Sequence, residues 1–331
     1  MLRLVLNEND GGQRLDKFLQ KSVKDLPMSL MYKYIRTKRI KVNGKRAKQD
    51  MKLNAGDIIE LYIPEEFTSD KKRSKAELFS GVTESPSIVY EDENIIICDK
   101  RPGILSHTGD SDENDSSSLS EKDTLIFMIQ AYLNKKGEYS PEDEASFAPA
   151  LCNRIDRNTG GLVIAAKNAM ALREMNRLIR ENGVKKQYLC AVHGIPKPAS
   201  RTMKDYLFKN SKTKTVTVYK EIRRGAKEII TSYRTLKTNK EHGLSLLEVT
   251  LGTGRTHQIR AHMASIGHPL LGEGKYAENK NDRKLGFKHQ ALYSYKITFT
   301  VSEGELSYLD SKVFEAPSDN IKFLSLFRGQ K

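Results

Sequence analysis

Apolar residues recur at helical spacing in two short stretches near the N-terminus. The first lies within residues 15–19 and the second within residues 30–35, with Pro27 between them. Because proline interrupts a helix, this pattern predicts two short amphipathic helices rather than one. Apolar and basic residues then alternate up to a turn at residues 43–44, and residues 53–64 predict another turn followed by a strand.

A longer series of elements begins near residue 86. Two apolar runs flank an acidic turn and predict a β-hairpin over residues 88–98. Asn168 is a helix-capping residue, and the apolar stripe after it predicts a helix that ends near residues 182–183. Other apolar runs predict three strands, at residues 162–166, from residue 188 and at residues 244–251, and a helix over residues 257–266.

Two polar stretches interrupt these patterns. Residues 65–85 are nearly free of periodic apolar residues, which indicates a linker. Residues 109–123 carry six acidic residues and a run of serines, which indicates an exposed loop within the second module. The length of 331 residues suits two domains at about 150 residues each. We therefore predict domains at residues 1–64 and 86–331, joined by the linker.

Composition excludes several classes of protein. Apolar residues make up 38% and charged residues 30% of the chain, as in globular proteins and unlike disordered or collagen-like chains. No apolar run approaches the roughly 18 residues of a membrane span, and residues 1–12 lack the pattern of a secretory signal. Cys98, Cys152 and Cys190 lie far apart without the spacing of a zinc site or a disulfide framework. We expect a cytoplasmic protein.

Positive charge is concentrated near the N-terminus. The chain has a formal net charge of +14, and residues 13–48 hold twelve basic residues against two acidic ones. Such a surface favours a polyanion, either nucleic acid or an acidic membrane, although a basic helix face can also be merely solvated. We favour RNA, and the candidate contacts are Arg14, Lys33, Arg36, Lys38, Arg39, Lys41, Lys45 and Arg46.

Candidate chemistry lies in separated segments of the second module. Asp156 precedes an apolar strand and lies between Arg154 and Arg157, whose positive charge favours an ionised carboxylate. The alternative is a turn-forming aspartate with surface ion pairs. Tyr188 begins a strand and faces either a cleft or the core. Arg255, at a strand-to-helix turn, is placed to pair with a carboxylate or a phosphate, whereas Arg260 is expected on another helix face.

Other motifs carry less information. Lys100 and His107 flank a bend at Pro102-Gly103 and are expected beside an opening. Three histidines at residues 257, 262 and 268 do not share one helical face, so we predict no metal site. Phosphate-cradling and dinucleotide-binding glycine motifs are absent from the sequence, so we predict no cofactor.

The ordered motifs resemble two known families. RLDKFL followed by RTKRIKVNGKRAK resembles the S4-type RNA-binding domain. DKRPGILSH, NRIDRNTGGLVIAAKN, KKQYLCAVHG and GRTHQIRAHMASIGHPLLG, in this order, resemble the RluA-type pseudouridine synthases of ribosomal large-subunit RNA. The resemblance spans nearly the whole chain. Three departures from its pattern are Asn153 in place of histidine, Gly160 in place of serine, and Arg101 between Lys100 and Pro102.

This resemblance implies an α+β fold with a mixed, mainly antiparallel sheet behind the small N-terminal module. It further implies an isomerase that converts uridine in RNA to pseudouridine without a cofactor. We favour 23S large-subunit ribosomal RNA as the substrate, and transfer RNA stays open because related enzymes use both. We expect a monomer without a metal. Asp156 would be the catalytic carboxylate, Tyr188 its aromatic partner and the base, and Arg255 the cation that orients Asp156 and assists base extrusion. Asp156 would attack C1′ of the sugar, attack C6 of the base or remove a sugar proton, and the sequence leaves these routes open.

Two rival functions remain at this stage. The first is a noncatalytic RNA-binding ribosome assembly factor that uses both modules as a basic clamp. The second is a hydrolase that uses Asp156 with His257, although neither a GxSxG elbow nor an HExxH helix is present in the sequence.

Overall fold

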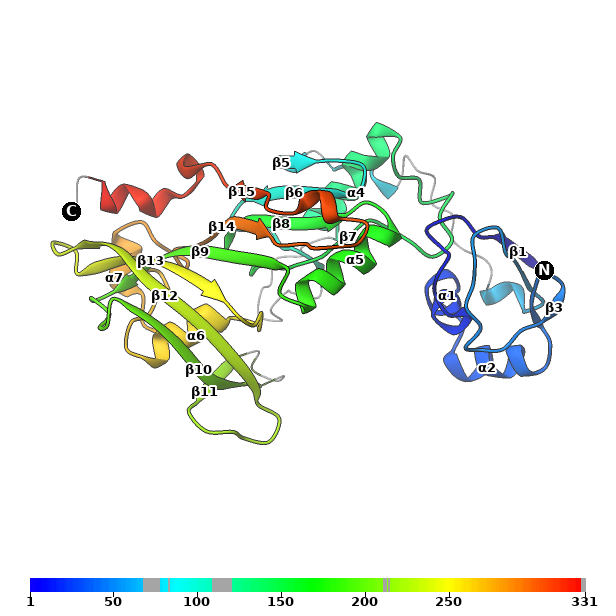
Figure 1. The fold of residues 1–331 in the computed structure, drawn as a ribbon, viewed down its shortest axis with the longest axis horizontal. Coiled ribbons are helices and arrows are strands. Elements are labelled where there is room, and N and C mark those ends of the chain that lie inside the picture. Colours follow the sequence, from blue (N-terminus) through cyan, green and yellow to red (C-terminus); the bar gives the residue numbers. More distant parts are fainter. Residues whose placement is uncertain (68–77, 83, 109–120, 211–212, 214, 329–331) are drawn as a thin grey trace.

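The computed structural model describes all residues except 68–77, 83, 109–120, 211–212, 214 and 329–331. Figure 1 shows an elongated molecule with the N-terminal module at one end and a large sheet extending towards the other. No helix among the described residues is both long and apolar enough to cross a membrane.

The N-terminal module is a four-stranded antiparallel sheet packed on two helices. Its strand order is β1-β4-β2-β3. The predicted helices and hairpin are present, because the apolar residues at helical and alternating spacing share one buried cluster. Its elements are β1 (Leu2–Val5), α1 (Leu15–Ser22), α2 (Met28–Arg36), β2 (Ile40–Val42), β3 (Lys45–Arg46) and β4 (Ile58–Leu61).

The second module is built on one eleven-stranded sheet. Nine strands follow the order β11-β10-β12-β13-β9-β14-β8-β6-β5, β15 pairs with β14, and β7 pairs with β8. The strands are β5 (Ile88–Glu91), β6 (Ile95–Lys100), β7 (Ala150–Leu151), β8 (Gly160–Ala166), β9 (Val184–His193), β10 (Ser200–Lys209), β11 (Val216–Tyr219), β12 (Lys227–Asn239), β13 (Leu244–Leu251), β14 (Leu292–Phe299) and β15 (Val313–Glu315).

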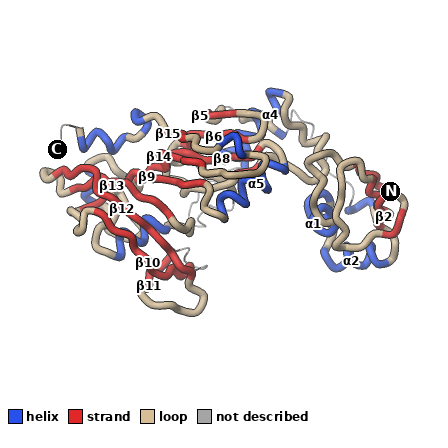
Figure 2. Tube along the Cα trace, viewed as in Figure 1, coloured by secondary structure: helices blue, strands red, loops and turns tan. Residues whose placement is uncertain are grey.

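Helices cover both faces of this sheet (Figure 2). They are α4 (Leu125–Lys136), α5 (Ala169–Arg180), α6 (Gln258–Ser265) and α7 (Lys280–Lys284). Short 3-10 turns occur at η1 (Glu65–Phe67), η3 (Glu121–Asp123), η4 (Ser307–Leu309), η5 (Ser318–Asn320) and η6 (Lys322–Phe327). Helix α5 and the C-terminal 3-10 turns bury apolar residues in one cluster, and α4 and α6 bury theirs in another.

Two halves of the sheet meet where β8 pairs with β14. This is the only parallel pairing among the described strands, so the predicted mixed and mainly antiparallel α+β fold is confirmed. Gly161 has φ +115° there, and a Cβ on it would lie 2.2 Å from the carbonyl oxygen of Ser294. Only glycine tolerates this backbone conformation and this close approach. The sheet can therefore join its two halves at this point, directly after the loop that carries Asp156.

A polar contact joins the two modules. Asp10 accepts hydrogen bonds from the backbone N–H and the hydroxyl of Ser146, at 3.0 and 2.6 Å. Asn9 accepts one from the backbone N–H of Ala169 at the start of α5, at 2.9 Å. Arg173 of the same helix donates to the carbonyl of Gly11 at 3.2 Å. These contacts fix the N-terminal module against the second one through loops rather than through a shared core.

The predicted domain boundaries, at residues 1–64, 65–85 and 86–331, remain a proposal. The described ends of the linker pack on different modules: Phe67 lies against the N-terminal core, and the Phe79 ring lies 5.3 Å from that of Phe127 on α4. Most of the predicted exposed loop at residues 109–123 lies outside the described residues.

Candidate active site

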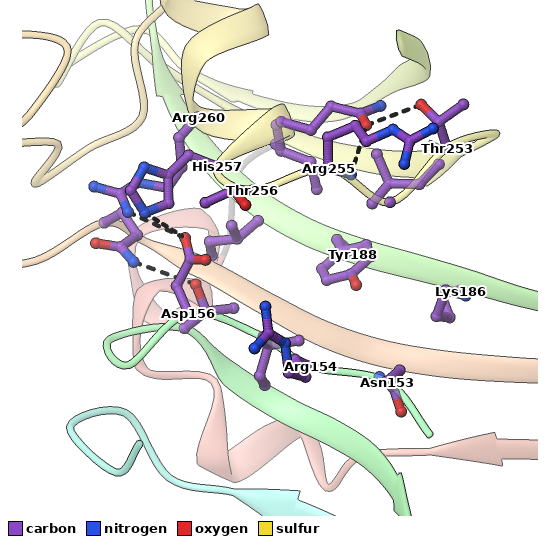
Figure 3. A pocket seen from close by; sticks show the side chains of 18 of the residues that line it. Asn153, Arg154, Asp156, Lys186, Tyr188, Thr253, Arg255, Thr256, His257 and Arg260 are labelled. Carbon is purple, nitrogen blue, oxygen red and sulfur yellow. Dashed lines mark hydrogen bonds and ion pairs between the residues drawn. The ribbon is translucent and has the colours of Figure 1, made fainter. Parts of the chain in front are cut away.

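A cavity of about 880 Å³ opens at the junction of the sheet halves (Figure 3). Its walls come from the loop before β8, from β9, and from the turn between β13 and α6. Asp156 is the one acidic residue among the described residues that line it. The basic residues there are Arg154, Arg157, Arg180, Lys186, Lys209, Arg255, Arg260 and Lys275. The cavity therefore suits an anionic ligand whose reacting group lies next to a single carboxylate.

Asp156 lies at the start of the tight turn that leads into β8. Its carbonyl accepts a hydrogen bond from the N–H of Thr159 at 3.0 Å. Its side chain is one-quarter exposed, and Oδ2 accepts a hydrogen bond from Nη1 of Arg260 at 3.0 Å. The Nε2 of His257 lies 3.9 Å from the same oxygen. One oxygen of the carboxylate is thus held by the Arg260 guanidinium, with the imidazole of His257 nearby.

The cation that orients Asp156 is Arg260, so the expectation for Arg255 was wrong in this respect. Helix α6 begins only at Gln258, because His257 adopts a left-handed conformation with φ 52° just before it. This turn directs the first helical residues towards Asp156. Arg255 lies before the turn, is exposed at the rim of the cavity, and donates its backbone N–H to Oε1 of Gln258 at 3.0 Å.

Glu273 holds Arg260 from behind. Its two carboxylate oxygens accept hydrogen bonds from Nε and Nη2 of Arg260 at 2.7 and 2.9 Å. Burial is the largest single effect on Glu273 and raises its pKa. The hydrogen bonds and charge of Arg260, together with the backbone N–H groups of Lys275 and Tyr276, outweigh burial and lower the pKa below its usual value. Glu273 was not predicted, because no recognisable sequence motif marks a residue thirteen positions after its partner Arg260. Only the tertiary fold brings the two together.

Tyr188 was expected to face either a cleft or the core, and it does both: it lines the cavity and belongs to the buried cluster. Burial raises the pKa of Tyr188 to about 12. Its hydroxyl is therefore protonated near neutral pH, and it would act as a base only after its own proton had left. Its role as the aromatic partner of Asp156 remains a prediction.

Lys100 does not flank an opening, contrary to the expectation from its motif. Its side chain is buried, and its ammonium donates to the carbonyls of Ile104 and Arg157 at 2.8 and 2.9 Å. A lysine amino group satisfied by backbone carbonyls ties these two loops together. Lys100 thus supports the Asp156 loop from within. His107 is exposed and is not among the residues that line the cavity.

The departures from the family motif have local physical reasons. A Cβ on Gly160 would lie 2.4 Å from the ring of Tyr293, so this ring occupies the space of any larger residue. The side-chain oxygen of Asn153 accepts a hydrogen bond from the N–H of Ile164 at 2.8 Å. Asn153 therefore supports the start of the Asp156 loop through a backbone contact with β8.

The proposed RNA contacts lie directly before α1, on α2, β2 and β3, and in the turn between α2 and β2. All are exposed except Lys41, which is half-buried with its amino group 5.2 Å from the centre of the Tyr62 ring. Arg14 forms an ion pair with Asp16 at 2.8 Å. Their role as RNA contacts stays a prediction.

A second basic surface lies outside the predicted RNA contacts. It lies on the arm formed by β10, β11 and β12, which projects away from the centre of the molecule in Figure 1. Arg223 lies over the Tyr219 ring at 4.2 Å, and Ile222 beside it is 77% exposed. Lys209 of the same arm lines the cavity. The sequence does contain repeated basic residues between positions 201 and 227. The denser basic run near the N-terminus drew the prediction there instead.

The sequence is similar to known RNA-modifying enzymes over most of its length. The family model described as RNA pseudouridylate synthase matches residues 94–265, and the S4 domain model matches residues 13–59. The chain is 31% identical to ribosomal large subunit pseudouridine synthase C of Buchnera aphidicola subsp. Baizongia pistaciae, over 89% of this chain and 88% of that protein. It is 30% identical to the Salmonella typhimurium protein of the same name, over 96% and 93%.

Solved structures show the same fold. Human RNA Pseudouridylate Synthase Domain Containing 4 superposes with a TM-score of 0.53 at 18% identity, over 76% of this chain and 95% of that one. Human RNA Pseudouridylate Synthase Domain Containing 1 superposes with a TM-score of 0.51 at 20% identity, over 75% and 96%.

Proposed function

We propose, from the premise that this chain belongs to the RNA pseudouridylate synthase family, that its substrate is a uridine of large-subunit ribosomal RNA. The chain is accordingly an RNA pseudouridine synthase, an isomerase. The substrate proposal rests on the relatives, which are named as ribosomal large subunit enzymes and match nearly the full length of the chain. A ribosomal RNA substrate is the reason to expect it in the cytoplasm.

The observation that carries the catalytic proposal is the carboxylate of Asp156 held by Arg260 in a cationic cavity. In the reaction, the bond from C1′ to N1 breaks and a bond from C1′ to C5 forms. The proton on C5 leaves and N1 gains a proton, so the product has the same atoms as the substrate. Asp156 would attack C1′, attack C6 or remove a sugar proton, and all three routes place a carboxylate oxygen beside the glycosidic bond.

The target uridine must leave its stack to reach Asp156. Flipping a base costs about a few kcal/mol, which contacts between protein cations and RNA phosphates can offset. We assign the exposed Arg255 at the cavity rim to base extrusion and to phosphate contacts, and Tyr188 to the face of the flipped nucleoside. Both assignments follow from their positions on the cavity wall.

RNA around the target would contact basic surfaces on both sides of the cavity. The first is the N-terminal S4 module, and the second is the arm formed by β10, β11 and β12. If about six cations neutralise phosphates, the logarithm of affinity should fall with the logarithm of salt concentration at a slope near −5. A membrane-binding surface predicts no such dependence of RNA binding.

Release of tritium from 5-tritiated uridine in RNA tests the catalytic proposal. Wild type should release the label, and Asp156→Asn should bind the RNA while releasing none. Equal release by both variants would contradict the role of Asp156. Absence of release from wild type on ribosomal and transfer RNA would favour the noncatalytic assembly factor, and a shortened RNA on a denaturing gel would favour the hydrolase.

Mapping pseudouridine across all RNA after deletion of the gene tests the substrate proposal. Sites lost from large-subunit ribosomal RNA and restored by the wild-type gene are the expected result. Loss confined to transfer RNA would overturn the ribosomal assignment while leaving the catalytic one intact. The gene encoding Asp156→Asn is the matched control, because it should restore RNA binding without restoring the sites.

A further inference from the structure

His257 lies between the catalytic carboxylate and the half-buried Tyr276. Its Nδ1 lies 2.6 Å from the hydroxyl of Tyr276, and its Nε2 lies 3.9 Å from Oδ2 of Asp156. The two rings meet edge to face, with centroids 5.7 Å apart. Figure 3 shows the imidazole beside the Arg260 guanidinium, with both directed at Asp156. Two groups from the start of α6 thus approach one oxygen.

The hydroxyl of Tyr276 fixes which imidazole nitrogen carries the proton. It accepts a hydrogen bond from the backbone N–H of Val216 at 3.3 Å. Among the described contacts, its remaining partner is Nδ1 of His257. Burial raises the pKa of Tyr276 to about 12, so the hydroxyl keeps its proton near neutral pH, and Nδ1 of His257 is the described acceptor within reach of its O–H. Nδ1 is then the acceptor, and a neutral imidazole carries its proton on Nε2, which faces Asp156.

The surroundings of His257 keep the imidazole neutral. Burial lowers the pKa of His257 to about 4, and the cations Arg260 and Lys275 act in the same direction. The carboxylates of Asp156 and Glu273 oppose this shift but do not outweigh it. Near neutral pH the side chain therefore presents a single N–H to Asp156 and keeps a lone pair towards Tyr276.

The backbone of His257 is held in an uncommon conformation that aims the ring. Its φ is 52°, in the left-handed region, which histidine adopts more readily than most residues but still at some cost. Such conformations persist where the surrounding structure enforces them, and they cluster at functional sites. Here the conformation lets the chain place His257 and Arg260 on the same side of Asp156.

We propose that His257 is a positioning residue that holds Oδ2 of Asp156 through its Nε2–H and thereby leaves Oδ1 as the reacting oxygen. Oδ2 already receives Arg260 at 3.0 Å, whereas Oδ1 accepts no hydrogen bond from the residues that the structure describes. The present 3.9 Å separation becomes a hydrogen bond after a shift of about 1 Å, a tightening that is common once substrate binds. This inference rests on the proposed catalytic role of Asp156.

Paired substitutions separate positioning from a backbone role. The amide nitrogen of glutamine reaches about as far as Nε2, whereas that of asparagine reaches only as far as Nδ1. Asparagine, however, suits the left-handed backbone better than glutamine does. We expect His257→Asn to lower the single-turnover rate of tritium release by about tenfold to a hundredfold, the range for one hydrogen bond to a charged group. His257→Gln should lose less.

A faster rate for His257→Asn than for His257→Gln would overturn the inference, because it would show that the backbone conformation and not the N–H matters. Equal rates for both variants and wild type would do the same. His242→Gln, in an exposed turn away from the cavity, is the matched control and should keep the wild-type rate. Thermal denaturation of each variant shows whether a lower rate reflects a lost fold.

The tautomer itself can be observed in the wild-type protein. Two-bond proton–nitrogen correlations of the imidazole rings distinguish Nε2–H from Nδ1–H and from the doubly protonated form. We expect His257 to be the Nε2–H tautomer near pH 7, and Tyr276→Phe to mix the two tautomers and lower the rate. An Nδ1–H or doubly protonated His257 in wild type would overturn the inference. This spectrum needs no substrate, so it remains decisive even if wild type proves inactive on RNA.

Discussion

Replacing Arg260 by methionine removes a buried cation that two carboxylates share. Methionine keeps much of the side-chain length, but Glu273 then remains fully buried without its guanidinium partner. Asp156 loses its hydrogen bond at 3.0 Å in the same step. The substitution therefore disturbs stability through one carboxylate and catalysis through the other.

The expected loss of stability can be worked out from this burial. Removing one partner of a buried ion pair costs about 3–5 kcal/mol, because the remaining charge stays out of water. In a unit the size of residues 86–331, each kcal/mol lowers Tm by about 2–4 °C. We therefore expect Arg260→Met to lower Tm by about 6–20 °C at neutral pH. Backbone N–H groups of Lys275 and Tyr276 still donate to Glu273 in this variant, so we expect the loss of Tm to lie towards the lower end of this range.

The double variant Arg260→Met/Glu273→Met separates the two effects. A well-packed apolar pair often replaces a buried ion pair without loss of stability. We expect the double variant to regain most of the lost Tm. Both the single and the double variant should be far less active than wild type, because Asp156 lacks the guanidinium that holds Oδ2. Thermal denaturation followed by circular dichroism measures the first quantity, and single-turnover tritium release measures the second.

Three results would refute this reasoning. A single variant with the Tm of wild type would show that Glu273 does not depend on Arg260. A double variant as unstable as the single one would show that packing, and not the uncompensated charge, causes the loss. A wild-type rate in either variant would show that Arg260 does not position Asp156.

Four further expectations concern other parts of the chain. Arg255→Ala should change the unfolding free energy by less than about 0.5 kcal/mol, because the side chain is exposed, while weakening RNA binding in a filter assay. Gly161→Ala should cost about 3 kcal/mol or more in urea denaturation, because its Cβ would meet the Ser294 backbone. Deletion of residues 1–64 should weaken RNA affinity more than it lowers the Tm of the remainder; collapse of the remainder would reject modular independence. The pKa of Glu273 is lower in the folded protein than its usual value of 4.5, so the ionised carboxylate stabilises the fold at pH values above 4.5. This stability is lost as the pH falls through the folded pKa, so the urea midpoint should drop at acid pH. The drop should be smaller in Glu273→Gln.

Local sequence patterns were enough to predict most elements of this fold. The helices at α1, α2 and α5 and the strands at β6, β8 and β13 lie where apolar spacing places them, since each buries one face. The family motifs also pointed to the residues that line the cavity, Asp156 and Tyr188 among them. Neither pattern contained the order of strands in the sheet or its parallel junction.

The sequence by itself determined which chemical groups this protein has and which short segments carry them. The tertiary structure alone decided which groups meet: Arg260 and not Arg255 at Asp156, Glu273 behind it, and Lys100 turned inward beneath the loop. The reason is physical. Periodicity reports the face that a residue presents to its nearest neighbours, whereas these contacts join segments 13 to 104 residues apart. Helix α6, which carries Arg260, also begins directly after a left-handed residue, His257, whose conformation no spacing rule indicates.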